Sequence, residues 1–138
     1  MHAGLAELIH VKIGVTSSRL SHLFNQGGNS IELLLTDNDA RRLFIKKISG
    51  FETEFGKAIE DRKIRVVFLI ITKKDPALKE NNLPFFSRMS LRRVARMLLG
   101  MNVKVSVQFV HDNKQLETRN KRRRTISLGS TGNNEVLN

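Results

Sequence analysis

The sequence contains no cysteine, no tryptophan and no tyrosine, and only two of its 138 residues are proline. Without cysteine there is no disulfide, no thiol nucleophile and no thiolate metal ligand, and the composition suits a reducing compartment. Eight phenylalanines are the main aromatic residues. Proteins that bind single-stranded nucleic acid stack bases on exposed aromatic side chains, so this scarcity argues against that mode of recognition.

Long apolar runs are also missing. No stretch approaches the ~18 consecutive apolar residues expected of a transmembrane helix. The first ten residues, "MHAGLAELIH", lack the basic segment and long apolar segment of a signal peptide. These absences predict a cytoplasmic protein without a transmembrane segment.

Positive charge is what the sequence has in excess. Lys and Arg number 24 against 13 Asp and Glu, which gives a formal net charge of +11. Each cation that neutralises a phosphate releases condensed counterions and adds salt-sensitive affinity. The charge therefore predicts DNA or RNA as a partner, with an anionic membrane surface as a further polyanion. Part of the charge comes from a run in the C-terminal region, Lys121, Arg122, Arg123 and Arg124.

Three segments have the pattern of β-strands, at residues 7–13, 64–72 and 102–110. The first and third alternate between apolar and polar residues, whereas the second is continuously apolar, as expected for a central strand covered on both faces. A helical pattern at 87–100 lies between the last two strands, which predicts a βαβ unit with parallel strands. We expect an α/β fold: a small mixed or parallel sheet of about three strands with flanking helices and a C-terminal βαβ unit.

The chain is long enough for one domain with its own core, which we place at residues 1–112. Residues 113–138 are polar and weakly patterned and are predicted to form a disordered basic tail. The first strand begins close to Met1, which predicts that upstream sequence is missing. A sheet edge left exposed in this way would favour a homo-oligomer.

Helix boundaries follow from capping residues and glycines. A helix is expected to begin near Arg19 and to end at Gly27 and Gly28. Residues 30–48 are expected to form two short helices, the second capped by Thr36 or Asp37. For the helix at 87–100, Ser87 or Ser90 is the expected cap. Its buried side is predicted to hold Leu91, Val94, Ala95, Leu98 and Leu99, and Phe85 and Phe86 are predicted to fill the core.

His10 and Lys12 are candidate catalytic residues. They are two apart on a strand, so their side chains emerge on one face. Some metal-dependent nucleases use an (Asp/Glu)-x-Lys pair in this geometry, in which the lysine assists the attacking water. Here His10 occupies the position of the acid, as a ligand or an orienting group. Mg²⁺ or Mn²⁺ would be the ion of such a nuclease. An edge strand with one solvated polar face explains the pair equally well.

Two helices carry candidate binding residues. Ser21, His22 and Gln26 fall along one side of the first helix and would line a site beside Lys12. Along the helix at 87–100, a line of arginines about 12 Å long is suited to successive phosphates; it consists of Arg88, Arg92 and Arg96, with Arg93 alongside. A solvated helix face is the alternative in both cases.

Three stretches, "LIHVK", "SSRLSHLFNQGGNSIELL" and "LPFFSRMSLRRVARMLLGMNVKVSV", together carry a family resemblance. In order and spacing they resemble the C-terminal part of a bacterial family known as sporadically distributed proteins, an uncharacterised group with a domain of unknown function. The resemblance covers residues 7 to 110 and implies a mobile or defence-associated gene and a fragment of a longer protein. It brings no established activity.

These observations lead to two hypotheses of different classes. The first is a nucleic-acid-interacting fragment of a mobile or defence-associated protein resembling metal-dependent nucleases, with the arginines holding phosphates. The alternative is a noncatalytic interaction or structural domain, or an inactive remnant of a truncated gene. The sequence leaves open whether the protein is an enzyme.

Overall fold

The structure, a computed structural model, describes residues 4–48 and 53–113. Within these residues the chain forms, in order, β1 (Ala6–Ile13), α1 (Ser17–Thr36), α2 (Asn38–Ile48), α3 (Thr53–Glu60), β2 (Ile64–Thr72), the short helix η1 (Pro76–Asn82), α4 (Phe85–Gly100) and β3 (Lys104–His111). The predicted α/β fold is confirmed. The predicted tail lies outside the described residues from position 114 onward.

The three strands form one parallel sheet in the order β1-β2-β3. The apolar strand β2 is central, as predicted, and β2, α4 and β3 form the predicted βαβ unit. In the register, His10 of β1 lies opposite Phe68 of β2, which lies opposite Val107 of β3. Parallel partners share a face of the sheet, so these three side chains all point toward the helices.

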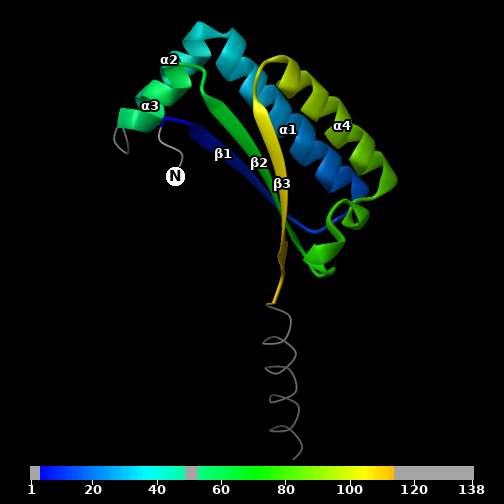
Figure 1. Ribbon diagram of the computed structural model, residues 1–138. Helices are drawn as coiled ribbons and strands as arrows, with labels where there is room; N and C mark the ends of the chain where they lie inside the picture. Colours follow the sequence, from blue (N-terminus) through cyan, green and yellow to red (C-terminus); the bar gives the residue numbers. More distant parts are fainter. Residues whose placement is uncertain (1–3, 49–52, 114–138) are drawn as a thin grey trace, which may run out of the picture.

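Helices α1 and α4 lie side by side on one face of this sheet (Figure 1). Phe24 of α1 packs edge-on against Phe68 of β2, with ring centroids 5.1 Å apart, at the centre of the core. Both rings are fully buried, as is Leu98 of α4. Within the described residues, no helix combines the length and apolarity needed to cross a bilayer.

Helix α1 does not end at Gly27 and Gly28, as predicted, but continues to Thr36. Both glycines are needed for close packing in the middle of the helix. A Cβ on Gly27 would lie 2.5 Å from Phe68 Cε1, and one on Gly28 would lie 2.9 Å from Val94 Cγ1. Glycine lowers helix propensity by about 1 kcal/mol relative to alanine. Here it lets α1 approach the sheet and α4 at once.

The contact between α1 and α4 is a seam of small and polar residues. The Oγ of Ser90 donates to the Oγ of Ser21 at 3.1 Å, and Arg93 Nη2 donates to Asn25 Oδ1 at 2.7 Å. Ser87 is buried and donates to the backbone oxygen of the first residue of α1. Neither Ser87 nor Ser90 caps α4, as had been predicted, because the helix begins two residues before Ser87 and its N-cap is a proline.

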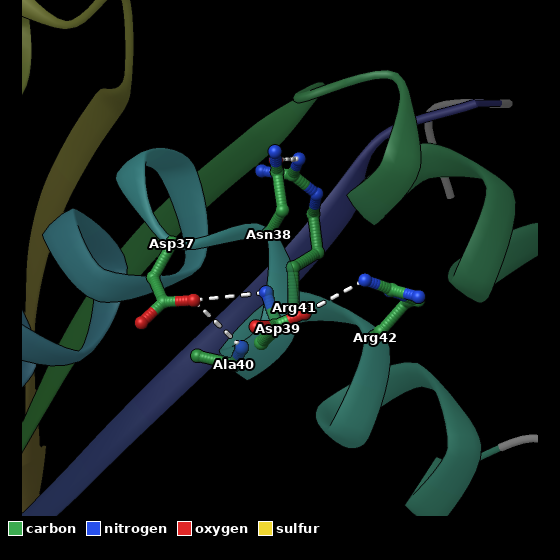
Figure 2. A network of polar contacts seen from close by, with 6 residues as sticks. All are labelled: Asp37, Asn38, Asp39, Ala40, Arg41 and Arg42. Carbon is green, nitrogen blue, oxygen red and sulfur yellow. Dashed lines mark hydrogen bonds and ion pairs between the residues drawn. The ribbon is translucent and has the colours of Figure 1, made fainter.

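The turn between α1 and α2 is fixed by Asp37, which confirms one of the two predicted caps (Figure 2). Its Oδ1 accepts hydrogen bonds from the backbone N–H groups of Asp39 at 2.8 Å and Ala40 at 3.0 Å. Thr36 instead belongs to the last turn of α1. The predicted break between two helices is therefore present, but the segment before it is the second half of α1.

The turn between α1 and α2 is also stabilised by Arg41 of α2. Its Nη1 donates to the backbone oxygen of Leu34 in α1 at 2.9 Å, and its Nη2 donates to Oδ1 of Asn38. Helices end with carbonyl groups that lack intrahelical partners, and an arginine satisfies them with charge-assisted bonds. Arg41 thus satisfies a backbone oxygen near the C-terminus of α1, and Asp37 satisfies two backbone N–H groups at the N-terminus of α2.

The other face of the sheet has no helix over it within the described residues; it is mostly apolar along β1 and polar along β3, where Lys104, Ser106 and Gln108 lie on it. Parallel sheets are normally covered on both faces, but the exposed fractions of Ile9, Val11 and Ile13 on β1 are 55%, 51% and 62%. For β2, helices of the described residues cover one face only, but on the other face Val67 is 2% exposed and Leu69 and Ile71 are half-buried. We call the exposed apolar part of this surface the open sheet face; it comprises Ile9, Val11, Ile13, Leu69, Ile71 and Val110.

Candidate nucleic-acid interface

His10 and Lys12 share the helix-covered face of β1, in agreement with their spacing, and both are half-buried. The His10 ring lies beside α1, where a Cβ on Gly27 would come within 3.1 Å of its Cδ2, and its centroid is 5.9 Å from that of Phe68. Burial lowers the pKa of His10, because desolvation disfavours the charged imidazolium. In this environment His10 packs the interface between α1 and the sheet.

The other residues predicted to line this site lie elsewhere on α1. Ser21 faces α4, where it bonds Ser90. His22 and Gln26 are exposed. At ~100° per residue they lie about 160° and 200° around the helix from Phe24, which faces the sheet. The structure therefore does not bring His22 and Gln26 together with His10 and Lys12.

Carboxylates that could complete a metal site are also missing beside His10. Glu7 lies on the opposite face of β1, where it forms an ion pair with Arg65 at 3.4 Å. Throughout residues 4–48 and 53–113, no three His, Cys, Asp or Glu side chains gather closely enough to hold a metal ion. The donor set around His10 and Lys12 does not fit Mg²⁺ or Mn²⁺, which prefer carboxylate and other oxygen ligands.

Arg92 and Arg96 of α4 lie on the side of the helix that faces away from the sheet, about 160° and 200° around it from the buried Val94, and Arg88 and Arg93 flank them. Arg92, Arg93 and Arg96 are exposed, whereas Arg88 is half-buried. Arg93 is held by Asn25 across the seam. In the described part of the chain, Arg92 and Arg96 form no hydrogen bond or ion pair. Because α4 contains no acidic residue, nothing on the helix itself neutralises these charges.

Arg88 differs from the exposed arginines. Its Nε is buried and has no hydrogen-bond partner among the described residues. Buried donors are normally satisfied by protein or water. Arg88 is one turn before Arg92, so this donor belongs to the same basic line along α4.

Phe85 and Phe86 are not core residues, as had been predicted, but are 61% and 72% exposed. Their rings contact each other edge-on, with centroids 5.5 Å apart and an interplanar angle of 75°. The helical period explains Phe85, because at ~100° per residue it lies about 180° around the helix from Val94, which is buried; Phe86 lies about 80° from Val94, on the same side as Arg93. Leu99, also predicted to be buried, is 61% exposed for the same reason.

A groove that the sequence did not indicate lies between η1, α4 and β3. Its volume is about 620 Å³, and its walls include Leu78, Lys79, Leu83, Leu91, Val107 and Phe109. Asn82 beside it is fully buried, and its Nδ2 donates to the backbone oxygen of Asp75 at 2.8 Å. No periodic signal in the sequence marks such a groove, because its walls come from three consecutive elements whose packing alone brings these side chains together.

The chain matches a protein family over most of its length. Residues 3–111 match a family described as "Family of unknown function (DUF6119)". No curated protein matches the chain, and no solved structure does. The match spans β1 to β3, and therefore every residue described above as part of a candidate site.

Proposed function

The chain belongs to the DUF6119 family, whose function is unknown, and we propose that it binds nucleic acid through the outward side of α4. The observation that carries the proposal is that the positive charges of Arg92 and Arg96 are exposed and not neutralised by the described residues. Both are exposed, both lack a partner among the described residues, and both lie on a helix without a carboxylate. Two unneutralised guanidinium groups one turn apart, about 6 Å along the axis, suit neighbouring phosphates.

The overall charge supports the same partner. A formal net charge of +11 attracts a polyanion over long range. Arginine binds phosphate through two parallel N–H donors, which adds geometry to the attraction. Arg93 and Arg88 flank the exposed pair and lengthen the basic line, which we call the α4 arginine line: Arg88, Arg92, Arg93 and Arg96.

The proposal is one of binding without a cleavage mechanism. Hydrolysis of a phosphodiester needs an activated nucleophile and stabilisation of the developing charge. Lys12 and His10 are half-buried on the helix-covered face of the sheet, whereas Arg92 and Arg96 are exposed on the side of α4 that faces away from the sheet. We also propose membership of the sporadically distributed proteins, supported by "LIHVK" and "LPFFS" within the matched span.

The test is a binding titration of the full chain with labelled DNA and RNA at several salt concentrations. We expect affinity to fall as salt rises, and the double variant R92Q/R96Q to weaken binding at least about tenfold and to reduce the salt slope by about two. The control is K47Q/K57Q, which removes two exposed charges from α2 and α3. Equal affinities of the two double variants, or no binding at low salt, would contradict the proposal.

A second candidate function, as a noncatalytic interaction domain, is favoured by the open sheet face. Ile9, Val11 and Ile13 place three large apolar side chains in water along an edge strand. Exposed apolar patches and free sheet edges are typical of interaction sites. We propose a second copy of the chain as the partner, and sedimentation of the purified protein distinguishes a monomer from a dimer.

A further inference from the structure

We propose that the α4 site is selective for single-stranded nucleic acid, whose bases stack on Phe85 and Phe86. This inference rests on the proposed function and names the substrate class of the same site. Its basis is the pair of exposed rings at the first turn of α4, set edge-on at 5.5 Å on the helix that carries the α4 arginine line. Side chains of this size are seldom left in water without a binding role when they adjoin one another.

The rings and the arginines are in register along the helix. Phe85 precedes Arg92 by seven residues, and Phe86 precedes Arg93 by seven residues. Seven residues are two helical turns, so each ring lies on the same side of α4 as its arginine, about 10 Å from it along the axis. A strand laid along α4 can thus place bases on the rings and phosphates on the guanidinium groups.

The rings discriminate between single strands and duplexes. In a duplex the faces of the bases are already stacked on their neighbours, and a ring on a convex helix surface cannot reach them. In a single strand every base offers a free face, and stacking on an aromatic side chain is tolerant of sequence. The arginines attract either form, because both carry phosphates. Selectivity therefore depends on Phe85 and Phe86, whereas general affinity depends on Arg92 and Arg96.

A membrane surface is the competing partner for an exposed helix with apolar and basic residues. The same outward side of α4 also exposes Met89 and Leu99, 49% and 61% accessible. Arg92 and Arg96 lie between these two along the helix, within the outward stripe. Insertion of the stripe into a bilayer would bury both guanidinium groups, which disfavours membrane insertion. A polyanion with aromatic faces satisfies both residue types at once.

The experiment compares ring variants of the full chain on a labelled oligothymidylate and on a hairpin duplex of the same charge. We expect F85L/F86L, which keeps apolar bulk, to weaken single-strand binding about tenfold or more. F85Y/F86Y, which keeps the rings, should bind as the unmodified protein does. Duplex affinity should stay unchanged in both variants. L43A, at an apolar position on α2 that is 65% exposed, is the control.

The outcomes separate the two proposals. Equal affinity of F85L/F86L and the unmodified chain for the single strand would overturn the stacking inference alone, provided that R92Q/R96Q still weakens binding. Failure of R92Q/R96Q to weaken binding would overturn the proposed function itself. Vesicles of phosphatidylserine and phosphatidylcholine form a third arm. If the unmodified chain bound vesicles, and F85L/F86L bound vesicles and oligothymidylate as well as the unmodified chain does, the site would be a membrane contact and the inference would be wrong.

Discussion

Gly27 of α1 lies so close to Phe68 of β2 that a Cβ at position 27 would come within 2.5 Å of the Phe68 ring. Phe68 is fully buried, and its ring also contacts Phe24. The ring therefore has no space into which it can move. This contact sets the distance between helix α1 and the sheet.

We expect G27A to destabilise the protein. Overpacking a dense core costs about 1–3 kcal/mol, which exceeds the ~1 kcal/mol that alanine gains over glycine in a helix. G100A is the matched control, because a Cβ at Gly100, the last residue of α4, meets nothing within 4 Å. Urea unfolding of both variants measures the difference. A G27A protein as stable as G100A would contradict the close packing described for α1.

Asp37 provides a second prediction, at the corner between α1 and α2. D37A removes the acceptor of two backbone hydrogen bonds and is expected to lower the free energy of unfolding by about 1 kcal/mol. D39A is the control: the Asp39 carboxylate forms an exposed ion pair with Arg42 at 2.7 Å, and such pairs contribute about 0.5 kcal/mol or less. If D39A proved the more damaging change in thermal unfolding, the cap would not be the stabilising feature.

His10 predicts a pH dependence of stability. Its pKa in the folded protein is below the ordinary value of 6.5, because burial disfavours the charged ring. The unfolded chain therefore binds more protons as the pH falls below 6.5. The stability linked to His10 is fully present above 6.5 and is lost as the pH falls through the lowered pKa.

The measurement is the urea midpoint across the acid range for the unmodified chain and for H10Q. Lys12 lies two residues away on the same face and is present in both proteins, so the comparison isolates the imidazole. We expect the decline in stability on acidification to be shallower in H10Q. H22Q, at an exposed position of α1, should keep the steeper decline. Parallel curves for all three proteins would show that His10 does not titrate in this way.

The open sheet face gives a fourth prediction. V11K places a charge at a position that is 51% exposed in the middle of β1. If a second copy covers this face, the charge would be buried on association, and we expect the dimer to dissociate at protein concentrations where the unmodified chain is paired. Sedimentation velocity follows the change, with N29K on the exposed side of α1 as the control. Dimerisation unaffected by V11K would place the contact elsewhere.

Local patterns in the sequence were sufficient to predict the three strands and which of them is central. The continuous apolar run "IRVVFLIIT" predicted the central strand, and the spacing of the last two strands around a helix predicted a parallel βαβ unit. Asp37 was among the predicted caps, because a cap depends only on residues within one turn. These features are set by neighbours in the chain, so the sequence reveals them directly.

The candidate site was predicted less well, because its parts depend on which side of each helix faces the core. Two successive glycines are typical of a helix end, but Gly27 and Gly28 lie in the middle of α1, where Phe68 and Val94 pack too closely for any larger residue. Phe85 and Phe86 are large apolar residues of the kind that usually fills a core. The helical period counted back from Val94 puts Phe85 on the opposite side of α4, but this argument requires knowing that the helix already includes Phe85.

By itself the sequence determined the α/β class, the parallel pairing of the last two strands, the excess of positive charge and the line of arginines along one helix, because each follows from composition or regular spacing. Only the tertiary structure decided that His22 and Gln26 lie apart from His10 and Lys12, that one face of the sheet is open, and that two phenylalanines stand beside the arginines. Those relationships arise where α1 and α4 pack on one face of the sheet, and contacts between distant segments have no signature in local sequence.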